Sequence, residues 1–191
     1  MRKNIGLDLD DVLLNFNDSF LDFHNNEYGT NYKREDITSY YIEDFWKIEV
    51  KEIQRRLGEF YKSVFHKNAT PISGAVEVVA RLSREHNLHI VTASPEEIKE
   101  EVEDWLSKHF GKRFSSISFT RKTPFDKSVL SKKKFCEDLK VDIFVDDALH
   151  NAEEIASLGI PVLLLDTPWN QGIVGPPIKR VYSWQEIEEN I

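Results

Sequence analysis

The chain has 191 residues, a length that suits one α/β domain with a modest insertion and is short for two independent cores. Apolar residues make up 40% and charged residues 30% of the chain, which excludes long disordered stretches. The net charge of −8 at pH 7 would repel nucleic acid, so no nucleic-acid partner is expected.

Short aliphatic segments that do not alternate in polarity recur along the chain. Such segments are typical of parallel strands buried on both faces of a sheet. Helical patterns separate them, which implies crossover connections and a doubly wound, Rossmann-like α/β sheet with helices on both faces. The predicted strands cover residues 5–9, 88–92, 142–145 and 161–165, with 116–119 as a weaker fifth candidate.

The segment after the first strand has a different pattern. Between residues 15 and 72 apolar side chains repeat at helical spacing, and no convincing strand is present. We therefore predict a small helical cap inserted at residues 15–72 and an α/β core made of residues 1–14 and 73–191. The helical spacing is carried by Phe16, Phe20, Phe23 and His24, then by Ile53, Leu57, Phe60 and Val64.

Capping residues and turn formers mark several element ends. Ser94 and Glu97 form a Ser-x-x-Glu capping box with a proline in its first turn, which predicts a helix directly after the second strand. A second box at Ser183–Glu186 predicts a short C-terminal helix, and Gly159 ends a helix ahead of the last predicted strand. Residues 166–177, rich in Pro and Gly, indicate a long loop.

Cysteine content and the apolar runs bear on the cellular setting. Cys136 is the single cysteine, so an internal disulfide and a cysteine-based metal site are excluded. No apolar run approaches the roughly 20 residues of a membrane span, and Asp8 interrupts the first run, which argues against a signal peptide. We expect a cytoplasmic protein without a membrane partner, and its oligomeric state stays open.

Two pairs of carboxylates follow predicted strands. Asp8 and Asp10 stand at the end of the first strand, and Asp146 and Asp147 follow a later one. Ligands of open α/β sheets bind at this edge, so the carboxylates should converge, and a divalent cation would relieve their repulsion. Oxygen ligands without histidine or cysteine favour Mg²⁺ over zinc. One aspartate alone could form an Asx turn or a helix cap, but two pairs favour a site.

The end of the second predicted strand offers an anion-binding candidate. Thr92 ends this strand and Ala93 and Ser94 follow at the predicted helix start, so their hydroxyls and amides could bind an anion. Ser94 could also act only as the helix cap. The run Lys132–Lys134 offers a cation, although a lysine run is usually a solvated face.

In this order the residues resemble the haloacid dehalogenase superfamily: Asp-x-Asp-x-Val on the first strand, an apolar strand ending in threonine, a lysine, then Asp-Asp after a further strand. The resemblance covers the whole core. It implies a phosphatase that works through an aspartyl-phosphate, with Asp8 as nucleophile and Asp10 as acid and base. It also implies Mg²⁺ bound by Asp8, Asp10 and Asp146, with Asp147 supporting the metal through water.

Phosphate contacts follow from the same resemblance. Thr92, Ala93 and Ser94 would bind the phosphoryl oxygens, and Lys132 would neutralise their charge. The choice of Lys132 depends on a Lys-x-x-x-Cys pattern followed by Leu-x-Val-Asp, which looks like one bacterial branch of the family, and Lys133 stays an alternative. The family's dehalogenases need no second aspartate two residues on, so its presence here favours phosphoryl chemistry.

The helical insertion is similar to the cap of the 5'(3')-deoxyribonucleotidases, whose pocket is lined by aromatic side chains. By that resemblance Phe16, Phe45 and Trp46 are candidates for a pocket that holds the base of a nucleoside monophosphate, with core packing as the alternative for each. Asp11 departs from the motif, because its position is often glycine, and it adds a carboxylate near the site.

Other functions remain open at this point. A phosphatase of sugar phosphates or another small phosphate metabolite would use the same core residues, and a phosphomutase would use them with an activated bisphosphate. A module that binds metal or phosphate without catalysis is the alternative from a different class. Turnover of an aryl phosphate with Mg²⁺ separates the enzymes from the module.

Overall fold

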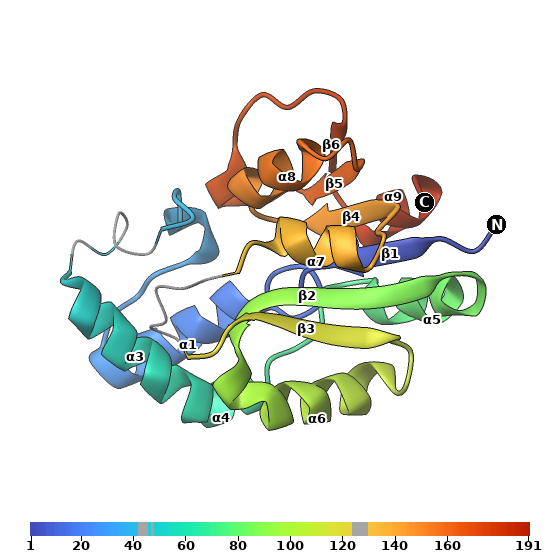
Figure 1. The fold of residues 1–191 in the computed structure, drawn as a ribbon. Coiled ribbons are helices and arrows are strands. Elements are labelled where there is room, and N and C mark those ends of the chain that lie inside the picture. The colour runs from blue at the N-terminus through green and yellow to red at the C-terminus, as the bar shows by residue number, and fades with distance from the viewer. Residues whose placement is uncertain (42–45, 47, 124–129) are drawn as a thin grey trace.

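A six-stranded parallel sheet forms the centre of the molecule (Figure 1). The structure, a computed structural model, describes residues 1–41, 46, 48–123 and 130–191. The strand order β3-β2-β1-β4-β5-β6 means that the chain winds outward from β1 in both directions. The strands are β1 (Asn4–Leu7), β2 (Asn87–Pro95), β3 (Ser116–Arg121), β4 (Ile143–Asp146), β5 (Val162–Leu165) and β6 (Ile178–Val181).

This sheet confirms the predicted α/β class, and each predicted strand is present. The short strands β4 and β5 are buried along their whole length, as expected for parallel strands covered on both faces. Strand β6 was not predicted. It pairs only with β5, and its two middle residues, Lys179 and Arg180, are polar because an edge strand leaves part of its surface to solvent.

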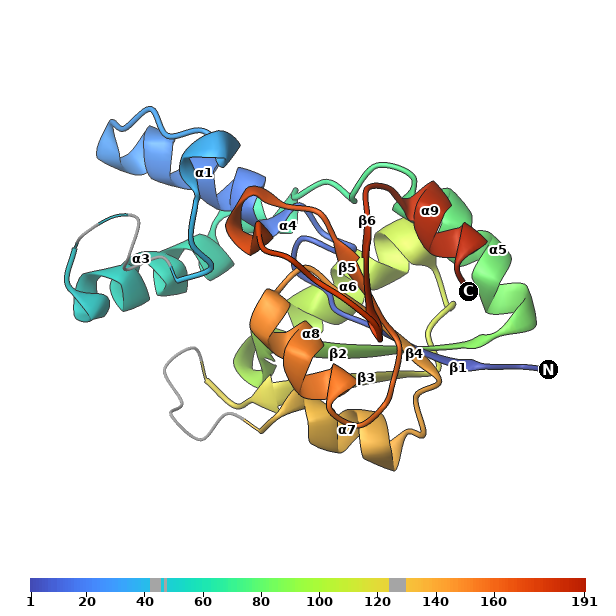
Figure 2. The ribbon, with the colours of Figure 1, turned by 90° about the horizontal axis from the view of Figure 1, so that it is seen from above.

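Helices cover both faces of the sheet (Figure 2). On one face lie α5 (Ala75–Glu85), α6 (Lys99–Phe110) and α9 (Trp184–Glu189), whose buried side chains join one hydrophobic cluster. On the other face lie α7 (Lys132–Asp138) and α8 (Leu149–Ala156), which contribute Cys136 and Ile155 to a second cluster. No helix among the described residues has the length and apolarity to cross a membrane.

One predicted helix start is wrong and another is confirmed. Strand β2 continues through Pro95, which pairs with Arg121 of β3, and a 3-10 turn (Glu96–Ile98) precedes α6, so Ser94 caps no helix. Pairing with the neighbouring strand overrides the local capping signal here. The C-terminal box behaves as predicted, because the Ser183 hydroxyl accepts a hydrogen bond from the Glu186 amide at 3.2 Å.

The described residues between 15 and 72, called the cap segment below, form a helical group beside the carboxyl edge of the sheet (Figure 1). An aromatic cluster holds these helices together, with the fully buried Phe60 at its centre, 5.0 Å from Phe20 and 5.3 Å from Phe16 between ring centroids. Its elements are α1 (Phe16–Tyr28), the 3-10 turn η1 (Arg34–Asp36), α3 (Val50–Lys62) and α4 (Val64–Lys67).

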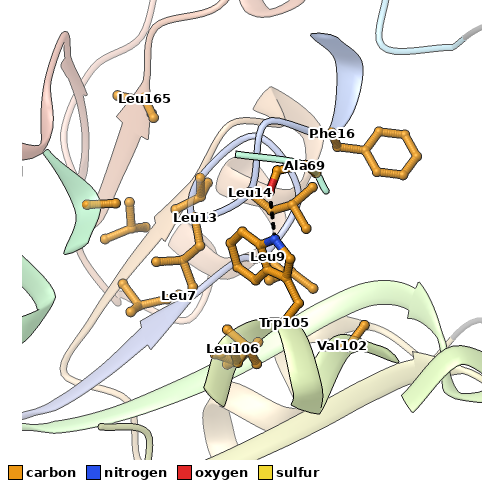
Figure 3. Packing of buried hydrophobic residues seen from close by; sticks show 14 of the residues in the cluster. Leu7, Leu9, Leu13, Leu14, Phe16, Ala69, Val102, Trp105, Leu106 and Leu165 are labelled. Atoms are coloured by element: carbon orange, nitrogen blue, oxygen red, sulfur yellow. Dashed lines mark hydrogen bonds between the residues drawn. The ribbon is translucent and has the colours of Figure 1, made fainter. Parts of the chain in front are cut away.

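The cap segment is anchored to the core through the surroundings of β1. Leu7, Leu9 and Trp105 of α6 belong to one buried cluster (Figure 3), and the Trp105 indole donates a hydrogen bond to the carbonyl of Ala69 at 2.8 Å. Within the sheet, Gly6 of β1 lies opposite Phe144 of β4, and a side chain at Gly6 would overlap the Phe144 ring. Close packing thus fixes β1 on both faces.

Candidate active site

The predicted carboxylates do converge at the carboxyl ends of β1 and β4. Asp8 follows β1 directly, and its amide donates to the carbonyl of Val145 at 2.9 Å, which continues the pairing of the two strands. Asp146 is the last residue of β4 and Asp147 follows it. The two strands belong to opposite halves of the sheet, so this is the point where the strand order reverses and where ligands of such sheets bind.

Three of these carboxylates form a compact buried group. Ligand oxygens of Asp8, Asp146 and Asp147 lie within 4.8 Å of one another, and all three residues are buried. Burial raises the pKa of Asp8 to about 7, with Asp146 and Asp10 adding to the rise and Lys132 opposing it. The pKa of Asp147 is raised well above its usual value, mainly by burial and further by repulsion from Asp146 and Asp8. The group carries more negative charge than the side chains around it neutralise.

Lys132 is the cation at this group. Its ammonium lies 2.6 Å from Asp8 Oδ2 and 2.8 Å from Asp146 Oδ2, and its side chain is 4% exposed. Burial disfavours the charged form of Lys132, but Asp146 and Asp8 outweigh burial and raise its pKa. The alternative, Lys133, points elsewhere and donates to the Ser157 hydroxyl at 3.1 Å on the surface.

Backbone amides hold the carboxylates in place. Asp146 Oδ1 accepts from the amide of Ala148 at 2.8 Å, and Asp8 Oδ1 accepts from the amide of Leu9 at 2.8 Å. Asp146 and Asp8 therefore each use one oxygen on backbone amides and the other on Lys132. Neither side chain is free to rotate away from the group.

Asp10 lies beside this group with a different set of partners. Its Oδ2 accepts from the Ser94 hydroxyl at 2.7 Å, while Oδ1 has no hydrogen bond to any described residue. Burial raises the pKa of Asp10 to about 6, against the Ser94 hydrogen bond, Lys132 and Arg121, which lower it. The carboxylate cluster thus differs from the predicted ligand set: the Asp10 side chain lies outside it, and Asp147 lies within it.

The expected phosphate-binding residues lie at the end of β2, next to Asp10. Thr92 is fully buried, and its hydroxyl accepts from the Ser94 amide at 2.9 Å, so that amide is already paired. The predicted free amides of a helix start are therefore not formed at Ser94. Of these three residues, only Ala93 is among the described residues that line the cavity above the carboxylates.

A cavity of about 300 Å³ opens above the carboxylates, between core and cap segment. This volume is at the lower end of the range for small-molecule sites. Its floor includes Asp8, Asp10 and Asp147. Its wall from the cap segment includes four aromatic residues, Phe16, Tyr40, Tyr41 and Tyr61. The other described residues of this wall are Asn17, Ser39, Ile53 and Leu57.

The structure distinguishes among the aromatic residues predicted to line a pocket. Phe16 lines the cavity. Trp46 is not among the described lining residues and stacks on His24 at a centroid distance of 4.0 Å, inside the cap segment. Phe45 lies outside the described residues. Tyr61, which was not predicted to do so, lines the cavity. The periodicity of the sequence does not distinguish Tyr61 from its aromatic neighbours.

Two further residues at the site were missed. Arg121 ends β3 and lines the cavity, so the strand-end rule that identified the aspartates would also have pointed to it. Trp169 lies in the loop after β5, and its indole donates to Asp147 Oδ2 at 2.7 Å. The turn residues of this loop indicated only irregular backbone.

Asp11 owes its place to an unusual backbone conformation. Its φ of 53° lies in the left-handed region that favours glycine, which accounts for the motif's preference at this position. The buried carboxylate accepts from the Asn17 side chain at 2.7 Å and from Arg34 of the cap segment at 3.1 Å. Burial raises the pKa of Asp11 to about 7 and Arg34 opposes that rise.

The residues at the carboxylate group fit a divalent cation. Their ligand atoms are all carboxylate oxygens, and no described histidine or cysteine joins them. Hard oxygen ligands of this kind suit Mg²⁺. After burial, repulsion between neighbouring carboxylates contributes to the raised pKa values of Asp8 and Asp147, and a dication would oppose that repulsion.

Comparison with known proteins gives consistent matches. Residues 2–191 match the family described as 5' nucleotidase, deoxy (pyrimidine), cytosolic type C protein. A nucleotidase of Clostridium acetobutylicum is 26% identical over 97% of this chain and 92% of its own length. The 5'(3')-deoxyribonucleotidase of Bacillus subtilis is 25% identical over 100% of this chain and 99% of its own.

A solved structure gives the same fold. The haloacid dehalogenase-like hydrolase SP0104 of Streptococcus pneumoniae superimposes with a TM-score of 0.71 at 15% identity, over 99% of this chain and 98% of that one. At this identity the likeness shows the fold alone. It agrees with the superfamily that the order of motifs resembled.

Proposed function

This chain belongs to the 5' nucleotidase, deoxy (pyrimidine), cytosolic type C family of haloacid dehalogenase-like phosphatases, and we propose that it hydrolyses deoxyribonucleoside monophosphates with Mg²⁺ through an aspartyl-phosphate. One observation carries the proposal. Asp8 and Asp147 line the floor of a cavity whose cap wall includes several aromatic rings, and Lys132 and Asp146 lie buried directly beside these two carboxylates. Charged groups that suit a phosphate and aromatic rings that suit a base thus lie around the same cavity.

Asp8 is the nucleophile of the proposed reaction. One of its carboxylate oxygens attacks phosphorus, the bond from phosphorus to the ester oxygen breaks, and the nucleoside leaves with that oxygen. Lys132, 2.6 Å from Asp8, would balance charge on the phosphoryl group during this transfer. A bound Mg²⁺, held by Asp8, Asp146 and Asp147, would supply further positive charge at the phosphoryl oxygens.

Asp10 acts as general acid and then general base. With a pKa of about 6, a useful fraction is protonated near neutral pH, and its Oδ1 has no described partner to compete for the proton. Asp10 first gives its proton to the leaving oxygen. It then takes a proton from water, which attacks phosphorus and releases phosphate, so that Asp8 is restored. Ser94 orients the carboxylate throughout.

The phosphoryl oxygens have a second set of proposed partners at the end of β2. Ala93 borders the cavity, while Thr92 and Ser94 are buried. The Ser94 amide donates a hydrogen bond to the Thr92 hydroxyl at 2.9 Å. We assign contact with phosphate to this segment because it lies beside Asp10. Thr92 and Ser94 would shape the segment so that Ala93 faces the ligand.

The cap wall supports a nucleotide substrate. Phe16 and Tyr61 border the cavity with their rings 6.1 Å apart, and both rings are held by Phe60 behind them. Stacking of a base on an aromatic ring contributes about 1–3 kcal/mol, which a small sugar phosphate cannot gain. The described family and the Bacillus subtilis relative both handle deoxyribonucleotides by name. Deoxyribonucleoside monophosphates are therefore the proposed substrate class.

A panel of phosphate monoesters tests this proposal. Released phosphate would be measured for the 5' and 3' monophosphates of the four deoxyribonucleosides, for ribonucleotides, for a hexose phosphate and for an aryl phosphate, each with Mg²⁺ or with EDTA. The highest kcat/KM should fall on a deoxyribonucleotide, and EDTA should abolish turnover until Mg²⁺ is restored. A preference for the hexose phosphate would reject the substrate, and full activity in EDTA would reject the metal.

A further inference from the structure

Trp169 lies directly behind the metal-site carboxylates. Its indole N–H donates to Asp147 Oδ2 at 2.7 Å, and both residues are buried. Among the described residues no other group donates a hydrogen bond to this carboxylate. Asp8 and Asp146 each accept from a backbone amide and pair with Lys132, whereas the described hydrogen bond to the Asp147 carboxylate comes from a side chain of another loop.

The loop that carries Trp169 is held firmly on its other side. The side-chain amide of Asn170 donates to the carbonyls of Asp147 and Leu165, both at 2.7 Å. Arg180 of β6 in turn donates to Asn170 Oδ1 at 2.6 Å and to the Asn170 carbonyl at 2.8 Å. The indole is thus presented from a fixed backbone.

Arg34 of the cap segment lies over one ring of this indole. The Arg34 guanidinium carbon lies 4.8 Å from the centroid of a Trp169 ring, within the range of cation–π attraction. The same guanidinium lies 3.1 Å from Asp11 and 3.0 Å from Asp18. Arg34 therefore contacts the cap, the loop after β1 and the tryptophan that orients Asp147.

We propose that Trp169 is a positioning residue of the metal site and that Arg34 makes its effect depend on the cap segment. The indole N–H holds the Asp147 carboxylate next to those of Asp8 and Asp146, and Arg34 keeps the indole in that position. The inference builds on the Mg²⁺ site of the proposed function and adds its link to the cap. Hydrogen-bond partners of metal ligands affect metal affinity by about 10–100-fold when removed.

Calorimetric titration of the substrate-free protein with Mg²⁺ tests the role of Trp169. Trp169→Phe keeps a ring for Arg34 and removes the N–H, so it should weaken Mg²⁺ binding by about 10–100-fold. Trp105→Phe is the matched control, because it removes another buried indole hydrogen bond, to Ala69 at 2.8 Å, away from the metal group. Its Mg²⁺ affinity should stay within about twofold of wild type. Circular dichroism would confirm that both variants fold.

A double-mutant cycle tests the role of Arg34. Arg34→Gln alone should weaken Mg²⁺ binding about threefold to tenfold, on the scale of a cation–π contact. In the Trp169→Phe background the same change should have little further effect, since the N–H through which Arg34 acts is gone. A merely structural role for Arg34 would give the same loss in both backgrounds.

The outcomes separate this inference from the proposed function. If the wild-type protein binds no Mg²⁺, the metal site itself is rejected. If the wild type binds Mg²⁺ and Trp169→Phe binds it as tightly as Trp105→Phe does, the positioning role of Trp169 is rejected and the metal site stands. Should Trp169→Phe not fold, Arg34→Gln decides, because an unchanged affinity would overturn the link to the cap.

Discussion

The two sides of the cavity are built in contrasting ways. On the core side, charged groups are fixed by short hydrogen bonds and ion pairs at strand ends, as with Lys132 between Asp8 and Asp146. On the cap side, rings such as Phe16, Phe20 and Phe60 pack against one another at centroid distances of 5.0–6.0 Å. Hydrogen bonds and ion pairs fix the positions of individual atoms, whereas packing between rings fixes only the shape of the cavity wall. Chemistry should therefore be sensitive to single atoms, and substrate fit to side-chain volume.

The largest effect should come from the core, at Asp8, the proposed nucleophile. Asp8→Asn should lower kcat by about four to six orders of magnitude, because the amide cannot form the covalent bond to phosphorus. The melting temperature should change little, since Asn keeps the size and the hydrogen bond to the Leu9 amide. Single-turnover phosphate release and a thermal melt would check this, and activity within tenfold of wild type would contradict the covalent role.

A second change in the core should act on proton transfer. Asp10→Asn should lower kcat for an alkyl phosphate by about 10²–10⁴-fold, because no group remains to protonate the leaving oxygen or to activate water. The loss should be smaller for an aryl phosphate in the first step, since its leaving group needs less protonation. Equal rates for the variant and the wild type on the alkyl substrate would refute the assignment.

In the cap segment, removal of a ring should mainly cost stability. Phe60→Ala should lower the free energy of unfolding by about 3–5 kcal/mol, because Phe60 is fully buried among other rings. Phe110→Ala, an equally buried ring in α6, is the matched core control. Urea unfolding should show similar losses for both variants. Only Phe60→Ala should also raise KM for a nucleotide, and equal KM values would remove the contrast between the two regions.

The smallest expected effect lies at the cavity wall. Phe16→Ala should raise KM for a deoxyribonucleotide by about tenfold and leave KM for a small aliphatic phosphate nearly unchanged, because only the base can stack. Phe23→Ala, on the same helix but away from the cavity, is the control. Steady-state kinetics on both substrates would measure the ratio. Parallel losses for the two substrates would show that Phe16 contributes packing alone.

The same contrast explains what could be predicted from sequence. Asp8 and Asp146 were identified because a short buried strand ends at each, and strand ends of a parallel sheet meet at one edge. Lys132 was chosen over Lys133 from a motif spacing, and the structure brings Lys132 to the carboxylates. The positions of residues at strand ends can thus be predicted from local sequence patterns.

Positions that depend on packing between distant segments were not readable. Trp46 and Tyr61 have similar chemistry and lie in the same cap segment, yet only Tyr61 lines the cavity among the described residues. Trp169 reaches Asp147 through the fold of a loop, 22 residues along the chain. Ser94 carries a sound capping signal that pairing of Pro95 with β3 overrides. Each miss reflects a tertiary contact that outweighs a local preference.

Gly6 of β1 affects the position of Lys132 through the ring of Phe144. Because this position has no side chain, the Phe144 ring can settle onto the strand, and the ammonium of Lys132 rests 5.8 Å from the centroid of that ring. The Lys132 ammonium therefore lies over a ring that occupies the space a side chain at Gly6 would need. A methyl group at Gly6 would overlap the Phe144 ring. Movement of that ring would in turn shift the Lys132 ammonium, although no polar atom is changed. The missing side chain at Gly6 thus helps to set the position of Lys132 beside Asp8 and Asp146.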